Sequence, residues 1–114
     1  MAHYAFLDEN NIVTDVIVGK DENDLPESAL VAELPEGVEF WEHYYGNIRN
    51  ATCKRTSYNT FANSHSGGGN PFRGNYAGIG FEYRADLDAF VPPMPDIEGS
   101  GPWIFDTKIM NWTV

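Results

Sequence analysis

Residues 75–93 read Asn-Tyr-Ala-Gly-Ile-Gly-Phe-Glu-Tyr-Arg-Ala-Asp-Leu-Asp-Ala-Phe-Val-Pro-Pro, which divides into two arms around a polar turn. The first arm, residues 76–83, places Ile79, Phe81 and Tyr83 on one face, and this period of two is typical of a half-buried strand. Residues 84–88 supply two aspartates, whose side chains form the local hydrogen bonds of tight turns. The second arm ends at Pro92 because proline cannot donate to a sheet ladder. The segment therefore predicts a β-hairpin with aromatic residues on both arms.

Similar hairpins are predicted at both ends of the chain. Residues 3–7 and 12–18 flank a turn at 8–11, and the returning arm is rich in the β-branched residues that favour strands. Residues 103–114 form a third predicted hairpin, which follows an irregular segment with four prolines in residues 92–102. Two single strands are expected between the hairpins, one over residues 38–45, where aromatic side chains alternate, and one within residues 52–60.

One short helix is predicted between the first hairpin and residue 38. Asp24, Pro26 and Glu27 have the spacing of a helix start, with an N-cap carboxylate, a proline in the first turn and a capping box. Residues 29–34 then give two turns, in which Leu30 and Leu34 would face the sheet. Residues 62–71 are rich in glycine, serine and asparagine, which predicts a long loop that is flexible or ordered by a partner.

The 114 residues correspond to one domain, 1–114, by length. Seven prolines and eleven glycines indicate many turns, and aromatic residues make up 14% of the chain, which enlarges a modest core. The expected fold is mainly β: a small antiparallel sheet or sandwich of hairpins with long irregular loops and at most one short helix.

Charge is distributed unevenly along this acidic chain, whose net charge is −10. Residues 46–84 contain five cations and one carboxylate, whereas residues 1–45 and 85–114 are both strongly acidic. The basic segment could dock an acidic partner or a second copy, or its cations could pair with the acidic ends of the same chain. The overall negative charge disfavours binding to nucleic acid. We expect neither a membrane helix, since no long apolar run is present, nor a signal peptide.

The motifs that carry chemistry are incomplete. Residues 78–80 begin like a dinucleotide-binding loop, but Tyr83 stands where the third glycine would be needed. The three histidines are far apart in the sequence, and Cys53 is the only cysteine, so metal-ligand spacings are missing and Cys53 is expected to be buried and inert. We therefore expect no catalytic residues, no metal and no cofactor, although a small hydrolase stays open as a third hypothesis.

Four segments together resemble small virion structural proteins of tailed bacteriophages, especially phages of aquatic bacteria such as cyanophages. They are residues 1–14, 54–60 (Lys-Arg-Thr-Ser-Tyr-Asn-Thr), 73–83 (Arg-Gly-Asn-Tyr-Ala-Gly-Ile-Gly-Phe-Glu-Tyr) and 88–93 (Asp-Ala-Phe-Val-Pro-Pro). A Pro-x-Pro and a tryptophan hairpin follow in that group, and here they correspond to residues 93–95 and 103–112. The chain departs from the group in its longer segment 96–102 and in its end at Val114.

The resemblance implies a non-enzymatic virion component that is assembled in the cytoplasm of a bacterial host. A capsid decoration, or cement, protein is the first expectation, with the major capsid protein or other virion proteins as partners and with oligomeric or lattice-arranged copies. A tail or tail-fibre module that contacts host glycans is the alternative. The residues expected to contact partners are aromatic or basic: Trp41, Tyr44, Tyr45, Arg49, Lys54, Arg55, Tyr58, Phe72, Arg73 and Trp103.

Overall fold

The computed structural model describes residues 2–99 and 101–114, and it confirms a mainly β, antiparallel protein. The strands are β1 (Ala2–Leu7), β2 (Val13–Gly19), β3 (Thr52–Thr56), β4 (Thr60–Phe61), β5 (Ser64–His65), β6 (Glu82–Arg84), β7 (Ala89–Val91), β8 (Ile104–Asp106) and β9 (Asn111–Thr113). The helices are the 3-10 helix η1 (Glu27–Leu30) and the α-helix α1 (Phe40–Arg49). Strands β1, β2 and β3 form one sheet in the order β2-β1-β3, and the other strands pair as two-stranded hairpins.

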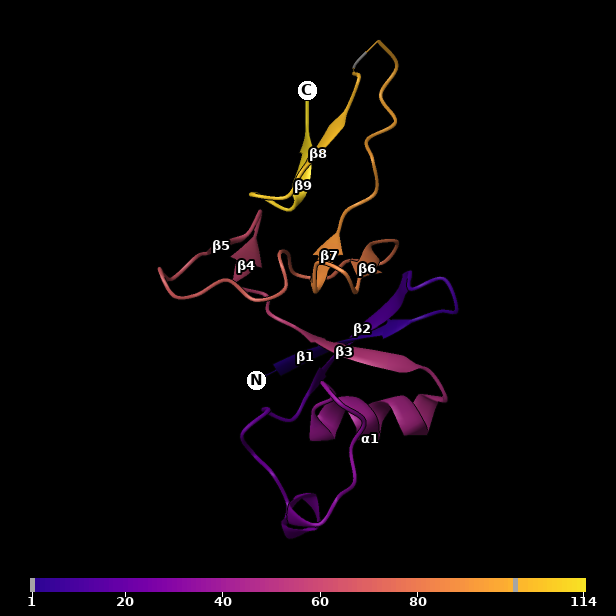
Figure 1. Cartoon of the computed structure of the whole chain (residues 1–114), viewed down its shortest axis with the longest axis vertical. Helices are drawn as coiled ribbons and strands as arrows, with labels where there is room; N and C mark the ends of the chain where they lie inside the picture. Colours follow the sequence, from indigo (N-terminus) through magenta and orange to yellow (C-terminus); the bar gives the residue numbers. More distant parts are fainter. Residues whose placement is uncertain (1, 100) are drawn as a thin grey trace.

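The first hairpin is confirmed, and its strand β1 is the centre of the molecule. Its turn is held by the Asp8 carboxylate, which accepts hydrogen bonds from the backbone N–H groups of Asn10 and Ile12 at 2.8 and 3.0 Å. β1 is paired on both edges, and its side chains are buried on both faces except for the half-buried His3. Tyr4 and Phe6 pack on the α1 side of the sheet, and the alternate residues pack on the β6–β7 side. The result is three layers: hairpin, sheet and helix (Figure 1).

The hairpin predicted over residues 75–93 is shorter than expected. Its ladder runs only from Glu82 to Arg84 and from Ala89 to Val91, around a turn at 85–88. The alternation predicted for the first arm is wrong before residue 82, because Gly80 adopts a positive φ of 92° and turns the chain. Ile79 is consequently 73% exposed although Ala77 is buried. The backbone of residues 80–83 instead forms hydrogen bonds with Asn11, in the turn before β2, and with Val13, at the start of β2.

The strand predicted over residues 38–45 is wrong, since α1 occupies most of it. Glu39 and Glu42 form a capping box in which each side chain accepts a hydrogen bond from the other residue's backbone. Asn50 closes the helix in the left-handed conformation, with φ 51° and ψ 47°. These two caps satisfy the helix ends, and the aromatic residues between them pack against one another and the sheet.

The helix predicted over 29–34 is also wrong, because only the four-residue η1 forms there. Leu30 is 87% exposed and does not face the sheet. No residue of η1 is buried, so no apolar face supports a longer helix. Two other predictions are confirmed. The strand expected within residues 52–60 is β3, and β8 and β9 form the hairpin expected at residues 103–114. The loop expected at 62–71 contains β5 but is otherwise irregular.

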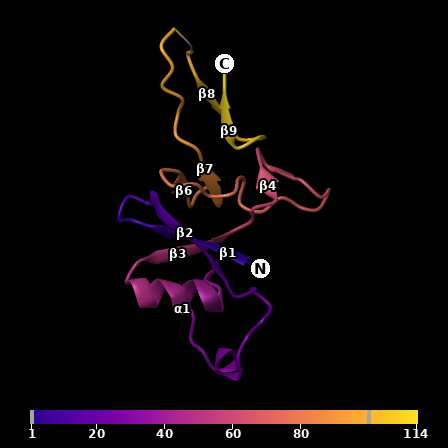
Figure 2. The same ribbon diagram turned by 180° about the vertical axis from the view of Figure 1, so that it is seen from behind.

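The molecule is elongated, with extents of 55 × 33 × 23 Å. Its radius of gyration of 15.2 Å exceeds the value of about 13 Å for a globular chain of this length. Two segments account for the difference and lie at opposite ends (Figures 1 and 2). We call residues 20–38 the acidic arm and residues 92–99 together with 101–114 the C-terminal arm.

Candidate interaction surface

Aromatic side chains anchor the base of the acidic arm to the helix and sheet. Tyr45 accepts a hydrogen bond from the Lys20 backbone N–H at 3.0 Å, and the Tyr4 hydroxyl donates to the Lys20 carbonyl at 2.6 Å. The indole N–H of Trp41 donates to the Asp24 carbonyl at 3.0 Å. Burial raises the pKa of Tyr4 well above its ordinary value, which keeps this hydroxyl a donor. The arm thus leaves the body from a fixed base.

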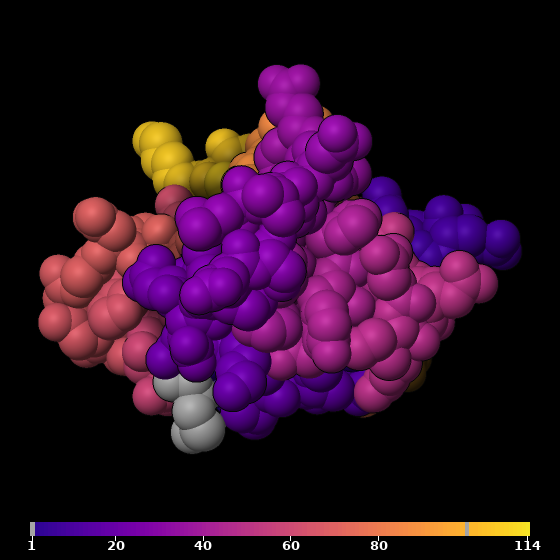
Figure 3. Space-filling model, turned by 90° about the horizontal axis from the view of Figure 1, so that it is seen from below, coloured from indigo at the N-terminus to yellow at the C-terminus, as the bar shows by residue number. Residues whose placement is uncertain are grey.

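The tip of the acidic arm exposes apolar side chains. Leu30 and Val31 are 87% and 82% exposed, and Leu25, nearer the base, is 51% exposed. The arm also contains six carboxylates against the single cation of Lys20. Figure 3 looks onto this end of the molecule and shows the arm projecting across it. An apolar tip surrounded by negative charge is unfavourable in water but fits a partner surface with an apolar centre and a basic rim.

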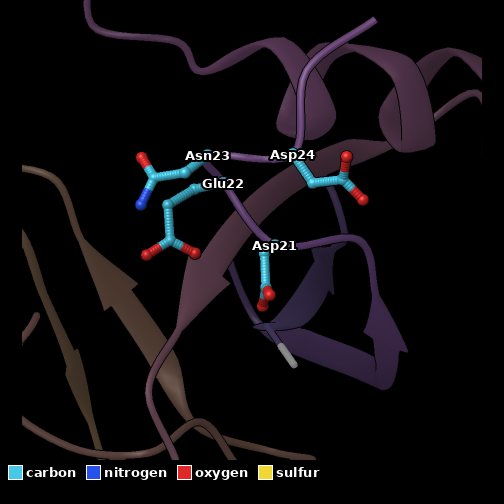
Figure 4. Close-up of a pocket in the computed structure, with 4 residues that line it drawn as sticks. All are labelled: Asp21, Glu22, Asn23 and Asp24. Carbon is cyan, nitrogen blue, oxygen red and sulfur yellow. The ribbon is translucent and has the colours of Figure 1, made fainter.

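The carboxylates at the start of the arm do not converge on a common point. Figure 4 shows the Glu22 and Asn23 side chains extending to one side of a shallow pocket, whereas Asp21 and Asp24 point in two other directions. Within residues 2–99 and 101–114, no group of three or more histidine, cysteine or acidic side chains could hold a metal ion. The three carboxylates of this loop add negative charge to the surface at the base of the arm.

The outer face of α1 adds a second apolar element. Tyr44 and Ile48, one turn apart, are 47% and 65% exposed, and the half-buried Phe40 stacks on Tyr44 with ring centroids 6.3 Å apart. Glu42 and Gly46 face the opposite way and are buried. The helix thus carries apolar side chains at a spacing of four residues on a face that is exposed in the described part of the chain.

Four of the five cations in residues 46–84 pair with carboxylates of the same chain, namely Arg49, Arg55, Arg73 and Arg84, whereas Lys54 lies over the Tyr83 ring. Arg49 meets Asp15 at 3.0 Å on the surface, and Arg55 forms a two-pronged pair with Glu39, the shorter contact being 2.7 Å. Arg73 is buried and meets Glu42 at 2.7 Å. Of the two interpretations of the basic segment, internal pairing is therefore the one that the structure supports.

Glu42 is the centre of a buried polar network. One carboxylate oxygen accepts the Glu39 N–H as part of the capping box, and the other accepts the Arg55 N–H and the Arg73 guanidinium, both at 2.7 Å. Arg73 also donates to the Arg55 carbonyl and to Asp88, which accepts the Tyr83 hydroxyl. The network joins α1, β3, the loop before residue 75 and the β6–β7 hairpin into one body.

The predicted contact residues separate into groups. Trp41, Tyr44 and Tyr45 come together in one aromatic cluster on α1, where only Tyr44 is largely exposed. Arg55 and Arg73 lie over the Phe72 ring, at 4.1 and 4.8 Å from its centroid, and both make their contacts inside the protein. The others lie apart from both groups: Arg49 in its surface pair, Lys54 over the Tyr83 ring, Tyr58 at an exposed turn and Trp103 on the C-terminal arm.

Several exposed apolar residues were not predicted from the sequence. On the C-terminal arm, Met94, Ile97 and Ile104 are 57%, 62% and 62% exposed. On the acidic arm, Leu30 was expected to be buried and is instead at the tip. The sequence did contain a signal for this exposure. These apolar residues lie in segments rich in proline and acidic residues, and such segments cannot bury apolar side chains in a core.

The C-terminal arm is held to the body mainly at the turn of its hairpin. The Asn75 amide donates to the Met110 carbonyl at 2.8 Å and to the Phe90 carbonyl at 2.9 Å, and its oxygen accepts the Ala62 N–H at 2.8 Å. Within the arm, the Trp112 indole donates to the Pro92 carbonyl at 2.8 Å, which joins the hairpin to the segment where the arm leaves the body. A two-stranded hairpin is only marginally stable by itself, so these contacts determine where the arm points.

We expect Asn75→Ala to destabilise the protein by about 2–3 kcal/mol, because it removes the partner of one buried and two partly buried backbone groups in three segments. Asn63→Gly is the matched control: it removes one exposed hydrogen bond to the same hairpin turn, at 3.1 Å to the Lys108 carbonyl, and glycine tolerates the positive φ of 57° at this residue, so the effect should be small. Urea denaturation of both variants measures the difference. Equal losses would show that Asn75 is not the main attachment.

Cys53 is buried, as the sequence predicted, and its thiol should be unreactive in the folded protein. Burial raises its pKa to about 12, and the nearby Glu42 carboxylate adds to the rise. A thiol reagent at pH 8 should therefore label Cys53 only after unfolding. Because the neutral thiol is favoured in the fold, its contribution to stability is complete below the ordinary pKa of 9.0 and falls as pH rises towards 12. Fast labelling without denaturant would contradict this.

No helix among the described residues is long and apolar enough to cross a membrane. Comparisons with models of protein families, with curated proteins and with solved structures found no match.

Proposed function

We propose that this chain is a non-enzymatic structural protein of a bacteriophage virion. Its role would be that of a capsid decoration protein, which binds the outside of the shell and bridges neighbouring subunits. The sequence resemblance supplies the virion context, since its segments follow the same order along most of the chain. The bridging role rests on the shape of the molecule.

The observation that carries the proposal is the placement of two arms at opposite ends of a 55 Å molecule. Each arm exposes large apolar side chains, Leu30 and Val31 at one end and Ile97 and Ile104 at the other. The buried centre of a protein interface is mainly apolar, so exposed side chains of this kind are suited to it. A molecule with one such contact at each end can connect two subunits, which a compact domain of equal size with a single patch cannot.

The buried network supports a scaffold role rather than a catalytic one. The hydrogen-bonding groups of Glu42 and Arg73 are occupied by each other and by backbone groups, and burial keeps the Cys53 thiol neutral. These groups make the body rigid, so that the two arms keep their separation. A rigid body lowers the entropy cost of binding at both ends at once.

Binding of the purified chain to particles tests this function. Particles of the encoding phage, prepared without this protein, are mixed with the labelled chain and sedimented. The proposal predicts saturable binding at hundreds of copies per particle, matching the number of shell subunits. Binding at a few to tens of copies would indicate the tail instead, and no binding at any concentration would overturn the proposal.

The salt dependence of the same binding identifies the contact. The arginines of the basic segment pair with carboxylates of the same chain. We therefore expect the apolar side chains of the arms to supply the affinity, and the charge of the acidic arm to guide the protein towards a basic surface of the shell. Added salt should therefore slow attachment while leaving the dissociation rate nearly unchanged. A large salt-induced rise in the dissociation rate would point to charge pairs at the centre of the contact.

A further inference from the structure

A small pocket lies where the start of β1, the end of β3 and the base of the acidic arm meet. Its volume is about 110 Å³, and its wall is mostly polar, with Glu22, Arg55, Ser57, Tyr58 and Asn59 among the lining residues. It does not include the arm tips, and it shares Arg55 with the network around Glu42. The apolar contacts of the proposed function do not use it.

Tyr58 forms an exposed aromatic platform at the rim of this pocket. Tyr58 is 63% exposed, which leaves much of its ring accessible to a ligand. The ring is held in place by the edge of the His3 imidazole, with centroids 5.2 Å apart. The turn that presents it is closed by a hydrogen bond from the Thr60 N–H to the Ser57 carbonyl at 3.1 Å. The platform is therefore pre-formed.

Hydrogen-bonding groups surround the platform. The Glu22 carboxylate is 36% exposed and is only loosely held by Arg55, at 3.5 Å, whereas Glu39 holds the same guanidinium at 2.7 Å. Glu22 can therefore accept hydrogen bonds from a ligand without breaking a strong pair. The Nδ1 atom of His3, in the wall of the pocket, is buried and has no hydrogen-bond partner among the described residues. Because that atom is buried, the partly exposed Glu22 carboxylate is the polar group that the pocket offers to a ligand beside the ring.

The surrounding charge selects against anions. The acidic arm forms one side of the pocket, and the whole chain carries a net charge of −10. Phosphates, carboxylates and nucleic acid would be repelled. A ligand that has one apolar face for the tyrosine and several hydroxyl donors for a carboxylate, and that carries no negative charge, fits these conditions.

We propose that this pocket binds a neutral pyranose sugar, with the apolar face of the ring stacked on Tyr58 and its hydroxyls donating to Glu22. Asn59 and Ser57 would complete the polar contacts at the rim. The inference is independent of the decoration function, because it concerns the free chain and a different surface. It gives the chain a means of holding surface glycans while its arms hold other proteins.

Titration of the isotope-labelled chain with methyl β-glucoside, methyl β-galactoside and methyl β-N-acetylglucosaminide, followed by amide NMR shifts, tests the proposal. At least one sugar should produce saturable shifts at Tyr58 and Asn59. Tyr58→Ala should weaken that binding by about tenfold, the size expected for loss of a stacking ring. Glucuronic acid should bind more weakly than the neutral sugars.

Phe61→Ala is the matched control, because Phe61 is 72% exposed and close in sequence but does not line the pocket. Binding should be unchanged in this variant, and a second variant, Glu22→Gln, should weaken it. Circular dichroism establishes that each variant is folded. Absence of saturable shifts with all three sugars, or binding that survives Tyr58→Ala, would overturn the proposal. Since no particles are present, that result would leave the decoration function untouched.

Discussion

Glu42→Gln should destabilise the folded protein by about 3–5 kcal/mol, the loss typical when one partner of a buried ion pair is removed. The Glu42 side chain is fully buried, and its carboxylate accepts hydrogen bonds from Arg73, the Arg55 N–H and the Glu39 N–H. A neutral amide would leave the buried Arg73 guanidinium without its counter-charge and would point N–H groups at other donors. Such a loss is a large part of the total stability of a small domain.

Urea denaturation followed by tryptophan fluorescence measures this effect. Glu82→Gln is the control, because Glu82 is an exposed carboxylate in β6 and its loss should cost almost nothing. The double variant Glu42→Leu/Arg73→Met removes both charges and should be more stable than Glu42→Gln alone, because no charge is then buried without a partner. A loss for Glu42→Gln as small as that for Glu82→Gln would show that the network does not hold the body together.

Leu30→Asp/Val31→Asp should reduce attachment to phage particles by at least about a hundredfold, since the few residues that dominate an interface cost about 2 kcal/mol or more each when they are lost. Two carboxylates at the tip would have to be desolvated in an apolar pocket of the shell. Stability should not change, because both side chains are more than 80% exposed in the folded protein. The variant therefore separates binding from folding.

Ile79→Asp is the matched control, because Ile79 is 73% exposed but lies on the body, outside both arms. It should bind particles like the unchanged chain. A denaturation curve for each variant verifies that the fold is intact. Equal loss of binding in the two variants would mean that the acidic arm has no special role, and unchanged binding of the arm variant would remove it from the contact.

The hairpins at the two ends were predictable from the sequence because their signals are local. Turn residues such as Asp8 and the alternation in the flanking strands act within a few positions of each other. The helix at Phe40–Arg49 was missed because aromatic residues both alternate and favour strands. Its capping box, Glu39 with Glu42, and its closing Asn50 are sequence signals that could have identified it.

The candidate surface was harder to predict because it depends on which side chains are paired or buried inside the folded protein. Counting charges found the basic segment, but only the fold shows that Arg55 and Arg73 face Glu39 and Glu42. Likewise, Leu30 and Val31 have the composition of a helix face, and only the direction of the arm exposes them. Sequence signals describe neighbours along the chain, whereas exposure is set by contacts between segments far apart.

A cryo-electron microscopy reconstruction of particles with and without this chain tests the central claim most directly. The bridging role predicts difference density on the outside of the head, elongated and contacting two neighbouring shell subunits through its two ends. Heads incubated with the Leu30→Asp/Val31→Asp variant should lack that density. Difference density confined to the tail, or a chain that touches one subunit only and leaves an arm free in solution, would contradict the account.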